Sequence, residues 1–248
     1  IALLGGVAAA WPLVLRAQPR KIPRLCFLTF DPGSLQTTRY GAFFEGLRDL
    51  GYVQGQTINI DYLTADGQAA RYATLAADCV GRGADVIVTS TTPLTQAAKQ
   101  ATQTIPIVMI AIGDPVGTGL VDSLARPGGN VTGLSQMFPS IAVKRLELLR
   151  ELAPRISRVL VPSYLSDPVA APQVNALQET ARSLGVTLQV RDIRTPDDLP
   201  VAFDAGMKER VEGVLPTGES IFVVNRARLV ELAARYKLPG VYHHRAIV

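Results

Sequence analysis

The segment Asp85–Pro93 reads DVIVTSTTP, and the segment Ile105–Val116 reads IPIVMIAIGDPV. Each contains an apolar run of the length of a buried strand, and each run ends in small, hydroxyl-bearing or acidic residues. In an open parallel sheet, the residues that follow the carboxyl ends of the strands line the ligand crevice. Because these polar residues form no obvious catalytic set, the two segments predict a binding protein rather than an enzyme.

The same alternation of strands and helices extends toward both ends of this region. We expect strands over Arg24–Phe30, Thr57–Leu63, Asp85–Thr89, Ile107–Ile110 and Val131–Ser135, and helices over Thr37–Leu50, Tyr72–Arg82, Leu94–Thr102 and Val116–Leu124. The strands are nearly continuous apolar runs, which is typical of strands covered on both faces. Right-handed crossovers between parallel strands follow as the default connection.

After the turn Arg126–Asn130 (RPGGN), the alternation begins again. Here we expect helices over Ala142–Leu152, Pro172–Leu184, Asp197–Lys208 and Arg226–Tyr236, the last capped by Asn225, and strands over Arg158–Val161, Val186–Val190, Gly213–Leu215 and Gly240–Tyr242. The sequence therefore predicts an α/β protein with two Rossmann-like, doubly wound parallel-sheet lobes joined by a hinge. The expected first lobe spans residues 22–133 and the second spans residues 134–242, while residues 243–248 begin a crossover back to the first lobe.

Composition narrows the possible partners. In 248 residues, 48% are hydrophobic and 19% are charged, which suits a large core and excludes global disorder. The formal net charge is +4, but basic residues are scattered beside acidic ones, as in Lys144, Arg145, Glu147, Arg150 and Glu151, which is typical of a solvated helix face. We therefore expect no nucleic-acid partner. The two histidines are adjacent, so the chain has no Cys/His zinc spacing, and we predict no metal and no cofactor.

Residues 1–17 are predicted to be the remnant of an export signal. The small-residue run Ile1–Ala10 is apolar but shorter than the roughly 20 residues of a membrane span. A membrane-anchoring stub is the alternative interpretation. If the segment is an export signal, the mature chain begins near Gln18 and is periplasmic.

Cys26 and Cys79 fall at apolar positions of a strand and a helix. Export would allow them to oxidise, but their spacing does not show whether they pair or are buried as separate thiols.

Several motifs along the chain resemble those of one protein family. They are the export-signal-like Ile1–Gly6, EGLRDLGYV at Glu45–Val53 with Gly55 and Gln56, GDPV at Gly113–Val116, RPGGNVTG at Arg126–Gly133, KRLELL at Lys144–Leu149 and NRARLVELA at Asn225–Ala233. Together they resemble ABC-transporter substrate-binding proteins of the tryptophan/tyrosine-uptake type, which have the type I periplasmic binding protein fold. The resemblance implies two lobes that close over a small ligand and deliver it to an ABC permease in the inner membrane.

The chain departs from this family's pattern in three places. The family usually has an Asn/Pro-rich loop where this chain has Pro162–Pro168 (PSYLSDP), and the loop Pro216–Ser220 (PTGES) also differs. Both changes fall where ligand would be contacted, so the identity of the ligand stays open. The family also continues beyond Val248, which predicts a C-terminally truncated fold whose first lobe lacks its final strand and helix.

In the first lobe, the candidate ligand-binding residues follow predicted strands. Ser90, Thr91 and Thr92 stand at a helix start, where hydroxyls and free backbone N–H groups can bind a ligand carboxylate or can simply cap the helix. Asp114 can likewise cap a helix or receive a ligand ammonium.

The other candidates fall in the loops that follow the first strand and two strands of the second lobe. They are Phe30, Asp31 and Ser34, then Ser163, Tyr164 and Asp167, and finally Glu219 and Ser220. The Phe30 ring can stack on an aromatic ligand or complete the core. Tyr242 and His243 fall near the expected hinge, where a solvated position or hinge packing is expected for them.

These observations favour an exported, monomeric solute-binding protein of an ABC importer, with a ligand such as an amino acid or an aromatic acid. A ligand-sensing domain of a signalling protein is one alternative. An enzyme on the same fold is another, although the chain has no nucleophile elbow, P-loop or dinucleotide fingerprint.

Overall fold

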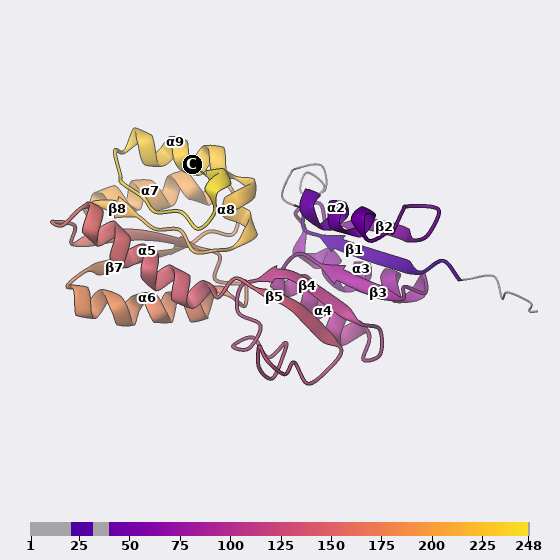
Figure 1. Ribbon diagram of the computed structural model, residues 1–248. Coiled ribbons are helices and arrows are strands. Elements are labelled where there is room, and N and C mark those ends of the chain that lie inside the picture. The colour runs from indigo at the N-terminus through magenta and orange to yellow at the C-terminus, as the bar shows by residue number, and fades with distance from the viewer. Residues whose placement is uncertain (1–20, 32–39, 248) are drawn as a thin grey trace, which may run out of the picture.

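The computed structural model describes residues 21–31 and 40–247, which form two lobes side by side (Figure 1). The first sheet has the strand order β2-β1-β3-β4-β5 and the second has the order β7-β6-β8. Neighbouring strands are parallel in both sheets. This arrangement confirms the predicted fold class of two parallel-sheet α/β lobes.

In the first lobe, helices cover both faces of the sheet. Its elements are β1 (Arg24–Thr29), α2 (Gly41–Asp49), β2 (Asn59–Thr64), the short 3-10 turn Ala69–Arg71, α3 (Tyr72–Gly81), β3 (Val86–Thr89), α4 (Thr92–Ala101), β4 (Ile107–Ile112) and β5 (Val131–Ser135). Along β1, Leu25 and Phe27 pack on the side of α2, whereas Cys26 and Leu28 pack on the side of α3 and α4. Such alternation between two buried faces explains the continuous apolar runs in the sequence.

The second lobe repeats this design around a smaller sheet. Its elements are α5 (Phe138–Leu152), β6 (Arg158–Ser163), α6 (Ala170–Leu184), β7 (Thr187–Asp192), α7 (Asp198–Lys208), β8 (Gly213–Val214), α8 (Ser220–Val224), α9 (Arg226–Arg235) and the 3-10 turn Arg245–Ile247. Val159 and Val161 of β6 pack with α5 and α6, and Leu160 packs with α7 and α9 on the opposite face (Figure 1). The chain passes from the first sheet to α5 at residues 136 and 137.

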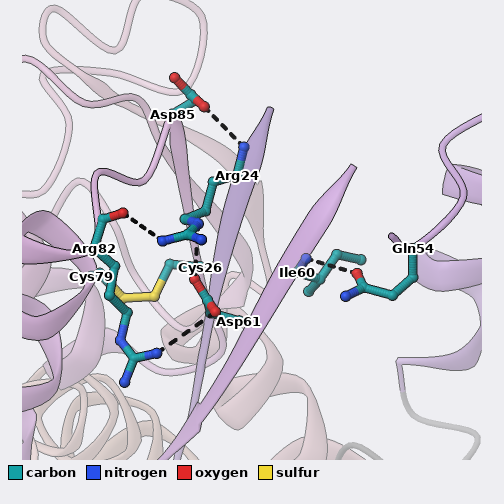
Figure 2. Close-up of polar contacts among 8 residues, drawn as sticks. All are labelled: Arg24, Cys26, Gln54, Ile60, Asp61, Cys79, Arg82 and Asp85. Atoms are coloured by element: carbon teal, nitrogen blue, oxygen red, sulfur yellow. Dashed lines mark hydrogen bonds and ion pairs between the residues drawn. A yellow bond between two sulfur atoms is a disulfide. The ribbon is translucent and has the colours of Figure 1, made fainter. Parts of the chain in front are cut away.

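Cys26 of β1 and Cys79 of α3 form a disulfide with a Cα–Cα distance of 5.7 Å. Both cysteines are fully buried. Figure 2 shows Asp61 of β2 beside this disulfide, facing Arg24 and Arg82 at 3.5 and 3.7 Å. The Arg24 guanidinium also donates to the backbone carbonyl of Arg82 at 2.8 Å. The two cysteines are therefore paired, which the sequence alone did not decide. The disulfide and the charged cluster of Arg24, Asp61 and Arg82 both join α3 to the sheet.

The predicted helix over Val116–Leu124 is wrong, because this segment consists of turns. Gly117 and Gly119 lower its helix propensity, and Gly119 has a φ of +68°, in the left-handed region that favours glycine. The Asp114 carboxylate accepts the Gly117 N–H at 2.9 Å and stabilises a turn in place of a helix.

Three expectations near the C-terminus also need correction. Residues 220–224 form the unpredicted helix α8, and Asn225 ends it while preceding α9. The Asn225 side chain donates to the carbonyl of Ile221 at 2.8 Å and makes no capping hydrogen bond to α9. The expected strand Gly240–Tyr242 is reduced to a single bridge between Val214 and Gly240, since β8 is only two residues long.

The expected export signal, residues 1–17, lies outside the described residues. In the part of the chain that the structure describes, no helix is long and apolar enough to cross a membrane.

Candidate functional site

A cleft lies between the two lobes, at the carboxyl ends of β3, β4, β6 and β8. Its lining residues are Ser90, Thr91, Thr92, Ile112, Gly113 and Gln136, followed by Phe138, Asp167, Val169, Gly218, Glu219 and Ser220. The cavity has a volume of about 20 Å³, enough for about one water molecule. The lobes touch across it, because a Cβ atom on Gly113 would lie 3.0 Å from Val169 Cγ1.

Phe138, the first residue of α5, lines the cleft where the chain passes between the lobes. Its backbone N–H donates to the Gly113 carbonyl at 2.8 Å. A Cβ atom on Gly113 would lie 2.5 Å from the Phe138 ring, and one on Gly218 would lie 2.7 Å from it. The two glycines therefore leave the space that the ring occupies. His243 packs edge-on against this ring at a centroid distance of 5.9 Å.

The first-lobe end of the cleft is the start of α4. The Thr91 hydroxyl accepts the Leu94 N–H at 3.4 Å, so Thr91 is the N-cap of this helix. Thr92 is buried beside it. Ser90 Oγ is also buried and has no hydrogen-bond partner within the described ranges. This end therefore presents hydroxyl groups and the positive end of a helix dipole.

The second-lobe end of the cleft carries two carboxyl groups. Glu219 is only 1% exposed; the Thr217 hydroxyl donates to its Oε2, and Gln173 Nε2 donates to its Oε1 at 3.2 Å. Burial, together with the negative charge of Asp167, raises the pKa of Glu219 to about 8. Burial also raises the pKa of Asp167 to about 6, against a backbone hydrogen bond from Val169 that lowers it.

Arg145 is buried in α5, contrary to the prediction that it belongs to a solvated face. Its Nη1 donates to the carbonyl of Pro216 at 2.7 Å and to that of Val241 at 3.4 Å. Burial lowers the pKa of Arg145 to about 10, while the negative charge of Glu219 raises it. Arg145 shares the inward face of α5 with Ala142, Leu146 and Leu149, and this helical spacing was the signal that could have predicted its burial.

Tyr72, at the start of α3 in the first lobe, lies close to the second lobe. Burial raises the pKa of its hydroxyl, and the neighbouring Asp167 and Tyr164 raise it further. The second-lobe loop that follows β6 therefore faces the first lobe directly.

The structure brings six of the candidate residues together in this cleft. They are Ser90, Thr91, Thr92, Asp167, Glu219 and Ser220. Sequence reasoning missed the other lining residues, which are Ile112, Gly113, Gln136, Phe138, Val169 and Gly218. Glycines at strand ends, which mark a close approach of the backbone, were the available signal for Gly218.

The remaining candidates that the structure describes lie outside the lining. Asp114 stabilises its own turn, Ser163 is fully buried at the end of β6, and Tyr164 is half-buried beside the two carboxyl groups. Phe30 and Asp31 are half-buried; the Phe30 ring lies 4.0 Å from where a Cβ atom on Gly67 would be. Ser34 lies outside the described residues.

A polar cleft at the strand ends of α/β lobes is the place where ligands bind in proteins with open parallel sheets. The chain belongs to the family described as ABC transporter substrate binding protein, whose family model matches residues 29–248. A tyrosine-binding protein of Clostridioides difficile (strain R20291) is 32% identical over 206 residues, covering 83% of this chain and 59% of that protein. This chain thus spans less than two thirds of that relative's length.

Solved structures agree with this assignment. An ABC domain from Streptococcus pneumonia in complex with L-Trp has a TM-score of 0.82 at 27% identity, covering 91% of this chain and 75% of that one. The ligand-free, open structure of a substrate binding protein with adhesive properties from Clostridium difficile has a TM-score of 0.62 at 27% identity, covering 92% and 76%. A leucine binding protein from Thermotoga maritima, at 13% identity and a TM-score of 0.68 over 89% of this chain and 62% of that one, shares the fold. The predicted type I periplasmic binding protein fold is confirmed.

Proposed function

We propose that this chain is the exported solute-binding protein of an ABC importer and that it closes its lobes over an L-amino acid with an aromatic side chain. The observation that carries this proposal is the polarity of the cleft. Hydroxyls and a helix N-terminus lie at the first-lobe end, and two carboxyl groups lie at the second-lobe end. A zwitterion between them would present its carboxylate to one lobe and its ammonium to the other.

The first-lobe end suits a carboxylate. Ser90 Oγ has an unused donor, Thr91 and Thr92 stand at the start of α4, and the helix dipole favours a negative charge there. Charge-assisted hydrogen bonds of this kind are stronger than neutral ones.

The second-lobe end suits an ammonium. Burial raises the pKa values of both Asp167 and Glu219, and the negative charge of Asp167 raises that of Glu219 further. A ligand cation between them would stabilise their ionised forms and lower both pKa values. Arg145 lies behind the lining, and the ammonium would therefore supply the positive charge that the lining residues themselves lack.

Lobe closure is part of the proposal, because a cavity of about 20 Å³ holds only about one water molecule. An amino acid would enter only after the lobes open about the hinge at residues 136 and 137. The TM-scores support two arrangements: at the same 27% identity, the chain superposes better on the L-Trp complex (0.82) than on the ligand-free, open structure (0.62).

The wider setting belongs to the same proposal. The buried disulfide suits an exported protein, since disulfides persist in oxidising compartments. We assign the chain a periplasmic location, a monomeric state, an ABC permease in the inner membrane as its partner, and a binding rather than a catalytic role. The choice of an aromatic amino acid is supported by the tyrosine-binding relative and by the relative in complex with L-Trp.

Calorimetric titration tests the proposal with L-tyrosine and L-tryptophan. Tyramine lacks the carboxylate and 3-(4-hydroxyphenyl)propionate lacks the amine, so each removes the contacts at one end of the cleft. We expect both analogues to bind at least about tenfold more weakly than L-tyrosine, because each loses hydrogen bonds to a charged group. Absence of binding by both amino acids would refute the proposed ligand class.

A further inference from the structure

Gln173, the fourth residue of α6, is fully buried and lies behind the cleft rather than in its lining. Its side-chain amide makes three hydrogen bonds. Nε2 donates to the Val169 carbonyl at 2.9 Å and to Glu219 Oε1 at 3.2 Å, and Oε1 accepts the Gly218 N–H at 2.9 Å.

The three partners of this amide have one property in common: Val169, Gly218 and Glu219 all line the cleft. Val169 is the N-cap residue of α6, whereas the other two belong to the loop after β8, in which Glu219 lies 46 residues from Gln173 in sequence. A single buried side chain thus joins two separate walls of the second-lobe end of the cleft.

We propose that Gln173 is the positioning residue of the ammonium site, holding the Glu219 carboxyl group and the Gly218 backbone in the arrangement that receives the ligand. This inference rests on the proposed function, because it assigns Gln173 a task toward the ligand's amine. Gln173 acts through Glu219 and does not itself contact the ligand.

The chemistry of the site requires an amide at this position. Glu219 Oε1 needs a donor and the Gly218 N–H needs an acceptor, and a Gln side chain offers both on one planar group. An aliphatic side chain offers neither, and it would leave two buried polar groups without partners.

The loop that carries Glu219 is held on its other side as well. The Thr217 N–H donates to the Pro162 carbonyl at 3.0 Å, and Arg145 donates to the Pro216 carbonyl. The charged groups that act on Glu219 are Asp167 from the loop after β6 and Arg145 from α5. Because these contacts hold the backbone of the loop after β8, the Gln173 amide determines the direction of the Glu219 carboxyl group.

The test compares Q173M with the wild-type chain by calorimetric titration of L-tyrosine and of 3-(4-hydroxyphenyl)propionate. We expect the Kd of L-tyrosine to rise at least about tenfold in Q173M, with little change in the Kd of the amine-free acid. Q178M is the matched control, because Gln178 is an exposed glutamine on the same helix. Q173N keeps an amide but shortens its reach by one methylene. If Q173M does not fold, the same titrations are made with Q173N, for which we also expect weaker binding of L-tyrosine.

A double-mutant cycle separates positioning from general structural damage. In an E219Q background, Q173M should cause no further loss of L-tyrosine affinity, since the group that it positions is no longer a carboxylate. Unchanged L-tyrosine affinity in folded Q173M or Q173N would overturn the inference, and so would an equal loss for both ligands. A wild-type chain that binds neither L-tyrosine nor L-tryptophan would instead refute the proposed function.

Discussion

Replacing Glu219 by Gln should stabilise the ligand-free protein near neutral pH and weaken its binding of an amino acid. The substitution keeps the shape of the side chain in a site that is almost fully buried. The new amide oxygen can accept from Gln173, and the new amide N–H can donate to the Thr217 hydroxyl, so both existing contacts can be retained. What the variant loses is the ability to ionise.

The magnitude follows from proton linkage. The folded chain holds the Glu219 proton up to a pKa of about 8, whereas the ordinary value is 4.5. As the pH rises between these values, the unfolded chain has released its proton and the folded chain has not, so the free energy of unfolding falls. The slope is about 1.4 kcal/mol per pH unit, and the total loss over the window is on the order of 4–5 kcal/mol. Asp167 acts in the same direction between pH 3.8 and about 6.

Urea unfolding at pH 5, 6, 7 and 8, without ligand, measures this effect. The free energy of unfolding of E219Q should exceed that of the wild type by an amount that increases with pH. E179Q is the control, because Glu179 is an exposed residue of α6 and its replacement should leave the pH dependence unchanged. If E219Q and the wild type lost stability with the same slope from pH 5 to 8, the assignment of this pH dependence to buried Glu219 would be refuted.

Two further predictions concern the first lobe. Replacing Cys26 and Cys79 together by Ala should lower the free energy of unfolding by about 4 kcal/mol, because the disulfide closes a loop of 53 residues. Urea unfolding curves of the variant and of the wild type, with and without a reductant, measure this loss. Equal unfolding midpoints for the variant and the oxidised wild type would contradict it. T91V should lose about 1 kcal/mol of stability, because Thr91 caps α4. T92V should keep its stability and bind L-tyrosine about tenfold more weakly. Melting curves and calorimetry on both variants distinguish a capping role from a ligand-binding role. Unchanged L-tyrosine affinity in T92V would show that the Thr92 hydroxyl does not bind the ligand.

The sequence predicts β1, β3 and β6 well because each is a local apolar run buried on both faces. It fails for Val116–Leu124, where apolar residues suggest a helix but glycines and the Asp114 turn determine the backbone. Charge patterning fails for Arg145, which is adjacent to acidic residues in sequence but lies on the inward face of α5. In both cases a local pattern was outweighed by a specific contact.

The candidate site is predictable only where strand ends determine it. The rule that ligands bind at the carboxyl edge of the sheet selects Ser90, Thr91, Thr92 and Glu219. It cannot select Phe138 or Gln173, whose importance comes from partners far away in the sequence. Gln173 meets Glu219 across 46 residues, and no spacing or periodicity in α6 indicates this contact.

The geometry of the cleft gives a physical reason for closure to depend on ligand. A closed, empty cleft buries the Asp167 and Glu219 carboxyl groups without a cation between them, and it leaves the Ser90 hydroxyl without a partner. Each of these costs free energy in the closed state and much less in an open, hydrated one. A zwitterion would reduce all three costs, so its affinity for the closed state would exceed its affinity for the open state. Such differential affinity is what allows a ligand to shift the equilibrium between two conformations.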